Sequence, residues 1–103
     1  MKDSIQDGLR DRLKETVDEA EWSWLIPHVK RDAVILVSSE INLLNAAETV
    51  ARDHKAQVQE WLSRGTLVKP TAEQIQNWGK TPAKKFLTVI VEPYVMAQEV
   101  ILN

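Results

Sequence analysis

Residues 58–78, VQEWLSRGTLVKPTAEQIQNW, contain the end of one helix and the capped start of the next. Three apolar side chains first share one helical face at spacings of three and four: Val58, Trp61 and Leu62. Gly65 follows them, and glycine ends a helix readily because it adopts the left-handed conformation without strain. Thr71 stands three residues before Gln74, which is the spacing of a capping box. The stretch therefore predicts a structural corner between two helices.

The apolar pattern extends upstream of this corner, so residues 42–64 are predicted to be helical. One interpretation is a single helix of about 22 residues. The other is two helices with a bend near Arg52, in which Asp53 is the N-cap of the second helix. The apolar face is continuous in both interpretations, so the sequence leaves them open.

Two short apolar runs are typical of strands that are buried on both faces. They lie near residues 33–38 and 86–92, and residues 94–102 are a further candidate strand. A tight hairpin at Glu92–Pro93 is not expected, because two-residue hairpin loops favour positive φ angles, which Pro cannot adopt. We therefore expect residues 94–102 to continue the second strand after a bend.

The N-terminal third is predicted to hold two helices. An amphipathic helix runs from about Ile5 to Glu19, with Ser4 as its N-cap. A shorter helix runs from Ser23, its N-cap, to about Arg31, with Pro27 in the first turn, where its missing N–H matters least.

Together these elements predict an α+β fold in which four or five helices pack on a small sheet of two or three strands. So few strands are unstable as a sheet on their own, so helices must cover them or a second copy must extend them. A homo-oligomer is therefore expected.

Length and composition limit the functional classes. The 103 residues are expected to form one domain, residues 1–103. Apolar residues make up 44% and charged residues 27%, as in a soluble globular protein. The absence of cysteine excludes disulfides and thiolate chemistry. The N-terminal stretch lacks the apolar segment of a secretory signal, and no apolar run approaches ~20 residues, so a cytoplasmic protein without a membrane span is expected.

The charge pattern argues against nucleic-acid binding. The net charge is −2 and is evenly spread, whereas a nucleic-acid-binding protein usually has a basic face. Lys80, Lys84 and Lys85 lie between two aromatic residues and could contact phosphate, but a solvated loop is the preferred interpretation. The corner at Gly65 also resembles a helix-turn-helix, yet its crossing is long and its second helix, AEQIQNW, has no Arg or Lys.

Candidate catalytic residues are few. The two histidines, His28 and His54, are far apart in the sequence, unlike the closely spaced ligands of most metal sites. Asp53 precedes His54, but neighbours on a helix point about 100° apart and do not face each other. No Ser-His-Asp order, nucleophile elbow or phosphate loop is present. We therefore expect no catalytic residue, no metal ligand and no cofactor.

The chain as a whole resembles a family of short bacterial proteins, Domain of Unknown Function 2288. The resemblance covers about Leu9 to Glu99 and rests on these residues: Leu9, Leu13, Glu21, Trp22, Ser23, Leu25, Pro27, His28, Val37, Leu43, Ala51, Asp53, Val58, Gln59, Trp61, Leu62, Gly65, Leu67, Pro70, Thr71, Gln74, Trp78, Val89, Val91, Pro93, Tyr94, Val95, Gln98 and Glu99. Arg31-Asp32 stands where the family is expected to have Arg-Gly, and Asp tolerates the left-handed turn that Gly would take. The resemblance implies kinship but no mechanism.

Two main hypotheses of function follow. The first is a small, non-catalytic, self-associating protein that binds a protein partner or a small ligand. Its candidate pocket or interface residues are Trp22, Trp24, His28, Asp53, His54, Tyr94 and Gln98, since aromatic anchors dominate such surfaces. The second is an enzyme or metal-dependent site assembled by the fold from His28, Asp53 and His54. A nucleic-acid-binding regulator is a weaker alternative.

Overall fold

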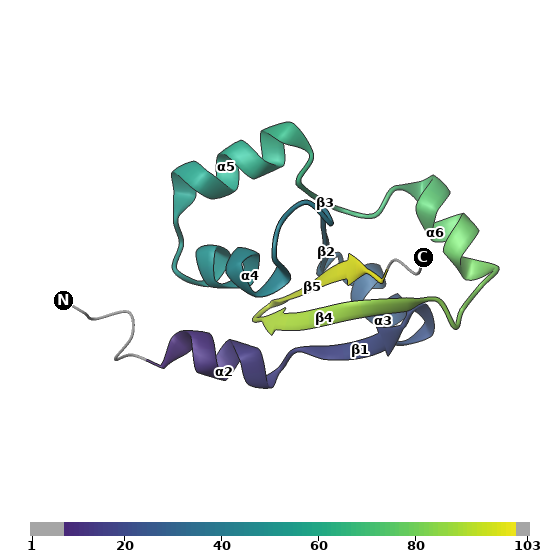
Figure 1. Cartoon of the computed structure of the whole chain (residues 1–103). Coiled ribbons are helices and arrows are strands. Elements are labelled where there is room, and N and C mark those ends of the chain that lie inside the picture. Colours follow the sequence, from purple (N-terminus) through teal and green to yellow (C-terminus); the bar gives the residue numbers. More distant parts are fainter. Residues whose placement is uncertain (1–7, 101–103) are drawn as a thin grey trace.

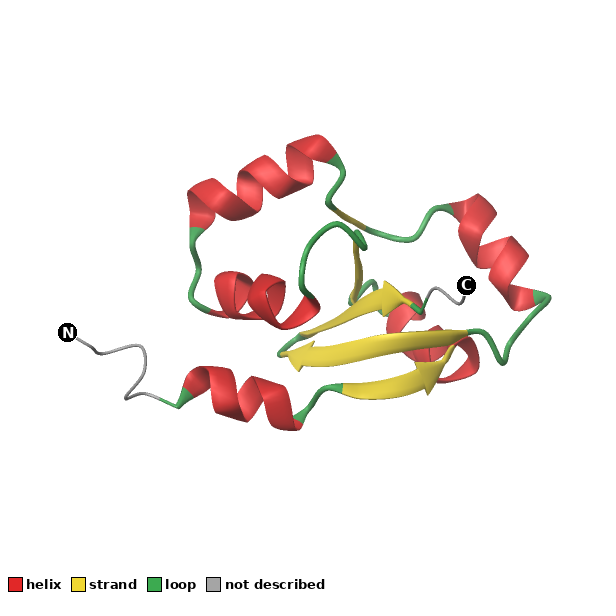
Figure 2. Ribbon diagram, viewed as in Figure 1, coloured by secondary structure: helices red, strands yellow, loops and turns green. Residues whose placement is uncertain are grey.

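The computed structural model describes residues 8–100 and arranges them as one sheet with helices on both sides (Figure 1, Figure 2). The helices of these residues are α2 (Leu9–Glu15), α3 (Trp22–Lys30), α4 (Leu43–Ala51), α5 (Lys55–Arg64) and α6 (Ala72–Gly79). The strands are β1 (Asp18–Glu21), β2 (Val34–Val37), β3 (Leu67–Val68), β4 (Lys85–Val91) and β5 (Tyr94–Glu99). The sheet order is β1-β4-β5-β2-β3; β2 and β5 pair in parallel and every other pair is antiparallel.

Each face of the sheet has its own hydrophobic core, because successive side chains of a strand point to opposite faces. In β5, Met96 packs in the core formed with α2, α4 and α5. Its neighbours Val95 and Ala97 pack in the core formed with α3 and α6. The prediction of strands that are buried on both faces is confirmed for β2 and β4. Within residues 8–100, no helix is long and apolar enough to cross a membrane.

The predicted sheet of two or three strands is wrong, because the sheet has five strands. The additional strands, β1 and β3, form its two edges. The sequence of β1, DEAE, is typical of the charged face of a helix, which is why the predicted helix includes part of it. In the structure these residues form a strand that pairs with β4, with Asp18 opposite Thr88. β3 has only two residues and pairs with β2 through Leu67 opposite Val37. Both strands depend on partners that are distant in the sequence.

The first described helix is shorter than predicted. It ends at Glu15 rather than at Glu19, and the Thr16 hydroxyl donates a hydrogen bond of 2.8 Å to the carbonyl of Leu13. The chain then enters β1. The predicted N-cap Ser4 and the predicted first residue Ile5 lie outside the described residues.

The second predicted helix exists, but its start is displaced. α3 begins at Trp22, so Ser23 is inside it and is not its N-cap. Pro27 is in the middle of the helix rather than in the first turn, and the helix continues because Arg31 N still donates to Pro27 O at 3.3 Å. Asp32 follows with φ 62°, which confirms the left-handed turn predicted at this position.

Residues 42–64 form two helices, which settles the alternative left open by the sequence. α4 is capped by Asn42, whose side chain accepts a hydrogen bond of 2.9 Å from Asn45 N. The N-cap of α5 is His54, and its side chain makes no capping bond. Asp53 is therefore not the predicted cap; it has φ 59° and makes the turn between the helices.

β4 and β5 form the tight hairpin that was not expected. Val91 pairs with Tyr94, which leaves a two-residue loop of Glu92 and Pro93. The Glu92–Pro93 peptide bond is cis. The prediction considered only turns with positive φ angles, whereas Pro also occupies turns in the cis form. β5 is thus the neighbour of β4 and not its continuation.

The corner that follows α5 is confirmed. Gly65 ends the helix with φ 77°, and Thr66 N donates to Trp61 O at 2.9 Å, as in a Schellman motif. At the start of α6, Gln74 N donates to the Thr71 hydroxyl at 3.1 Å. Thr71 N donates in return to the Gln74 side chain at 2.9 Å, which completes the capping box.

Candidate functional site

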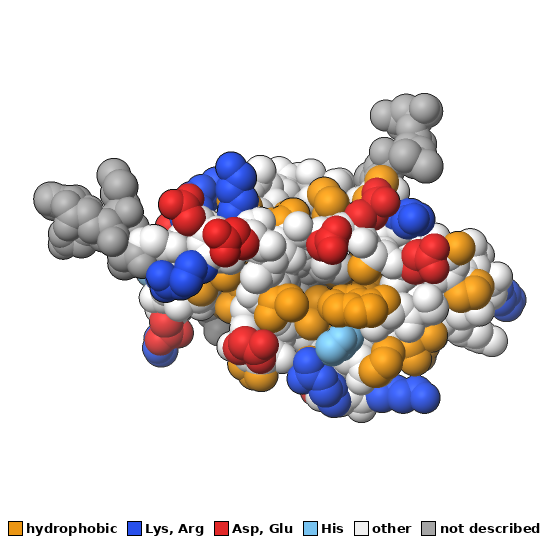
Figure 3. All heavy atoms as spheres, turned by 90° about the horizontal axis from the view of Figure 1, so that it is seen from below, with side chains coloured by type: hydrophobic (Ala, Val, Ile, Leu, Met, Phe, Trp, Pro, Cys, Tyr) orange, Lys and Arg blue, Asp and Glu red, His pale blue; other side chains and the backbone are white. Residues whose placement is uncertain are grey.

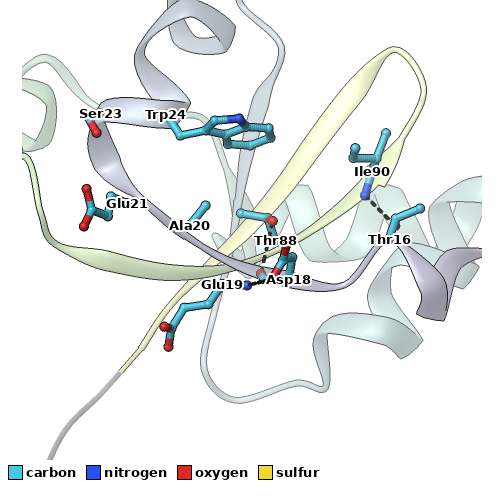
Figure 4. A pocket seen from close by; sticks show the side chains of 9 residues that line it. All are labelled: Thr16, Asp18, Glu19, Ala20, Glu21, Ser23, Trp24, Thr88 and Ile90. Atoms are coloured by element: carbon cyan, nitrogen blue, oxygen red, sulfur yellow. Dashed lines mark hydrogen bonds between the residues drawn. The ribbon is translucent and has the colours of Figure 1, made fainter.

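A groove of about 390 Å³ opens between α3 and the sheet face of β1 and β4, and we call it the Trp24 groove (Figure 4). The residues that define it here are Thr16, Asp18, Ala20, Trp24, Thr88 and Ile90. Figure 4 shows the Trp24 ring above the sheet, with Ala20 and Thr88 below it. Because Asp18 pairs with Thr88 and side chains alternate along a strand, β1 and β4 place their lining residues on the same face.

α3 directs one tryptophan into the core and the next one to the groove. Trp22 and Trp24 are two positions apart, so their side chains point about 200° apart around the helix. Trp22 is 1% exposed, and its ring centroid lies 5.0 Å from that of Trp78 and 5.9 Å from that of Phe86. Trp24 is 44% exposed. Trp22 is therefore a core residue, and Trp24 offers an aromatic surface to solvent.

The two threonine hydroxyls of the groove already serve the fold. The Thr88 hydroxyl donates to the backbone carbonyl of Asp18 at 3.2 Å. The Thr16 hydroxyl accepts a hydrogen bond of 3.1 Å from Ile90 N. The Asp18 carboxylate accepts one of 2.8 Å from Glu19 N. The two threonine bonds hold β1 and the end of α2 against β4, so the surface left open is mainly that of Trp24, Ala20 and Ile90.

One side of the groove is acidic. β1 contributes three carboxylates in four residues: Asp18 on the groove face, and Glu19 and Glu21, which alternation places on the other face of this edge strand. Lys85 lies beside two of them, with its Nζ 3.7 Å from Glu19 and 4.0 Å from Glu21. One lysine next to three carboxylates leaves an excess of negative charge, so we call these β1 residues the acidic rim.

The other side is basic. The His28 ring packs on Trp24, with ring centroids 4.7 Å apart. The Arg31 guanidinium lies 2.9 Å from His28 Nδ1 and donates to Pro93 O at 3.2 Å. We call His28 and Arg31 the basic rim. Figure 3 shows this face: most of its carboxylates lie above a central apolar patch, and a histidine and cationic side chains lie below it, beside a further carboxylate.

Two other predicted site residues lie away from the groove. Gln98 is half-buried, and its Nε2 donates to Ser38 O at 2.9 Å and to Ile41 O at 2.8 Å. It therefore braces the connection from β2 to α4. Tyr94 is 38% exposed, but alternation along β5 places it on the face of Met96, opposite the groove.

The structure does not bring His28 together with Asp53 and His54. These two residues lie at the connection between α4 and α5, which cover the sheet face opposite α3. Both side chains are exposed, and the Asp53 carboxylate forms an ion pair with Lys55. Among residues 8–100, no three His, Cys, Asp or Glu side chains are grouped to hold a metal ion.

A separate polar cavity next to His54 contains an ion-pair network. Arg10 donates to Glu48 at 2.8 Å, and Arg52 Nε donates to the other oxygen of this carboxylate at 3.0 Å. The hydrogen bond from Arg10, with the bond and charge of Arg52, lowers the pKa of Glu48 despite its partial burial. This network ties α2 to α4 and serves the fold.

Of the three lysines considered for phosphate contact, Lys84 and Lys85 form ion pairs with carboxylates. Lys84 Nζ lies 3.1 Å from Glu99 and within 6 Å of the Trp78 and Phe86 ring centroids, at 5.9 and 5.6 Å. Lys85 contacts the acidic rim. These ion pairs favour the interpretation that does not involve nucleic acid.

Of the predicted site residues, the structure brings Trp24 and His28 together. The groove residues Thr16, Ala20, Thr88 and Ile90 were missed, because β1 was interpreted as part of a helix. The available signal was Thr88, a hydroxyl inside the apolar strand FLTVIV that proves to be only 3% exposed.

Comparisons with known proteins give a family and a fold. The model of a protein family of unknown function, DUF2288, matches residues 8–99. The chain is also similar to PA1075 from Pseudomonas aeruginosa, solved by NMR in solution, with 25% identity and a TM-score of 0.75 over 99% of this chain and 94% of that one. No curated protein matches the chain. Because the family model covers most of the sequence, the chain belongs to the DUF2288 family, as its resemblance predicted.

Proposed function

We propose that this protein is a non-catalytic, self-associating binding protein of the cytoplasm, and that the Trp24 groove is its contact surface. The observation that carries the proposal is the exposure of the Trp24 ring, 44%, at the centre of an open groove. Tryptophan is the residue type most enriched among those that dominate the energy of protein contacts.

The two threonine hydroxyls of the groove support binding rather than catalysis. A catalytic site needs a nucleophile or a general base that is free to reach the substrate. Here the Thr88 and Thr16 hydroxyls are engaged by the backbone of Asp18 and Ile90. What remains is apolar surface between two charged rims, as in a protein contact with an apolar centre and a polar border.

A protein partner suits this groove better than a small ligand. Small-ligand sites enclose most of the ligand and orient it with a few polar groups that converge on it. The Trp24 groove lies between α3 and the sheet (Figure 4), and its two threonine hydroxyls are occupied. A broad surface of a partner can cover it without such polar groups.

Trp24→Ala tests the proposal. We expect the dissociation constant of the self-associated form to rise at least ~10-fold, because the main aromatic contact is lost. Sedimentation velocity over a series of concentrations measures it. Leu62→Ala is the matched control, because Leu62 is an even more exposed apolar side chain, 49%, on α5.

Thermal unfolding of both variants accompanies the measurement. Trp24 is outside the buried core, so its loss should leave the unfolding temperature near that of the wild type. Equal effects of the two variants on association would rule out the Trp24 groove as the contact surface. Unfolding of Trp24→Ala at ordinary temperature would assign Trp24 to the core instead.

A further inference from the structure

We propose that the occupant of the Trp24 groove is a second copy of this chain, related by a two-fold axis that runs along the groove between the two rims. In this arrangement the acidic rim of each copy faces the basic rim of its partner. The inference rests on the proposed function and specifies its partner and geometry.

The order of charges across the face is the first argument. The acidic rim on β1 and the basic rim of His28 and Arg31 lie on opposite sides of Trp24. A two-fold axis lying between two facing copies turns one of them over, so that its acidic side meets the basic side of the other. The same rotation brings the two Trp24 rings together at the axis. The face is therefore complementary to itself.

The charges of both rims are available for this contact. Arg31 bonds to His28 Nδ1 and to the carbonyl of Pro93, and neither of these is a carboxylate. On the acidic rim, the Asp18 carboxylate accepts a hydrogen bond from the backbone N–H of Glu19, which lies in its own strand. An ion pair between Asp18 and Arg31 of the other copy would add charge complementarity, which suppresses wrong pairings and fixes the register of a contact.

Pairing of two copies through the edges of β1 is disfavoured. Its four residues would place carboxylates opposite carboxylates in an antiparallel pair, and like charges opposite each other destabilise a sheet. Charged side chains are a common protection of sheet edges against such pairing. Beside β1, the groove face rather than the strand edge is thus the surface that a second copy can use.

The area that a stable dimer must bury is consistent with a contact that includes both rims. A stable protein contact buries about 800 Å² on each partner. The surface of the chain is 6571 Å², so such a contact covers about an eighth of it. The apolar centre around Trp24 and Ile90 needs the surrounding rims to reach this size.

The test uses two charge-reversed variants, Asp18→Lys and Arg31→Glu, measured alone and mixed in equal amounts. Each variant alone places like charges opposite each other twice in its own dimer, and its dissociation constant should rise at least ~10-fold. In a mixed dimer, both contacts join opposite charges again. Sedimentation velocity of the mixture should give an affinity within about threefold of that of the wild type.

The outcomes separate the two proposals. A mixture that associates no better than its components would overturn the two-fold arrangement, while a loss of association in Trp24→Ala would still support the groove as the contact surface. A wild-type chain that is monomeric at all concentrations would overturn both. If a charge-reversed chain does not fold, Asp18→Asn and Arg31→Gln replace it; each must weaken association, and no loss from either would overturn the arrangement.

Discussion

Trp22 and Trp24 show how far two residues of one helical turn can differ in role. Both were candidates for a pocket or interface, since a sequence gives each of them the same aromatic character. The rotation of the helix buries Trp22 among Trp78 and Phe86 and leaves Trp24 beside an open groove. Whether an aromatic residue of a helix is buried or exposed depends on what lies against the side of the helix that carries it. On the side of Trp24, the groove is lined by Thr88 and Ala20.

Glu48→Gln should reduce the pH dependence of stability. The pKa of Glu48 in the folded chain is lowered from its usual 4.5 by the hydrogen bond from Arg10 and by Arg52. A lowered folded-state pKa means that the stabilisation is present above pH 4.5 and is lost as the pH falls through the folded value. Urea unfolding at a series of pH values between neutral and acidic measures this effect.

The control for this prediction is Glu60→Gln. Glu60 accepts a hydrogen bond of 3.1 Å from Arg64, but both side chains are more than half exposed, and such ion pairs contribute little. We expect the unfolding free energy of Glu48→Gln to approach that of the wild type only at acidic pH, and Glu60→Gln to follow the wild type throughout. A constant difference between Glu48→Gln and the wild type at all pH values would contradict the linkage.

At the scale of elements, local signals predicted the corner after α5 but not the edges of the sheet. Gly65 and the Thr71–Gln74 box act within a few residues of their own position, so the sequence contains all that determines them. β1 and β3 depend on distant pairing, such as Asp18 with Thr88, which no local pattern records. Missing β1 also hid the floor of the candidate site.

Gly65→Ala should destabilise the chain by about 1 kcal/mol, because an L-residue is strained in the left-handed conformation. Gly65 has φ 77°, and nothing lies within 4 Å of an added Cβ, so the backbone alone accounts for the loss. Chemical denaturation measures it.

Gly79→Ala is its matched control. Gly79 is the last residue of α6, its φ is not positive, and an added Cβ also meets nothing within 4 Å. Because Ala favours a helix over Gly, this variant should be as stable as the wild type or more so. Equal losses in the two variants would contradict the role of the left-handed turn at Gly65.

At the scale of the molecule, charge that is evenly spread along the sequence is arranged by the fold into a face with an acidic side and a basic side. The net charge of −2 and the absence of a charged segment suggested no directed electrostatics. Yet folding places β1 on one side of Trp24 and His28 with Arg31 on the other, so that one face carries both signs in order. Counting the charges of a sequence segment does not reveal this arrangement, because the acidic rim and the basic rim lie close together in the sequence and their charges cancel in the count.

The mass of the wild-type chain in solution tests the central claim most directly. Sedimentation equilibrium from low micromolar to near-millimolar concentration reports this mass without a label or a variant. Self-association through the Trp24 groove predicts a mass that rises with concentration from 11.7 kDa towards twice that value and no further, because the two-fold contact is closed. A constant mass of 11.7 kDa would contradict the account, and so would growth beyond the dimer.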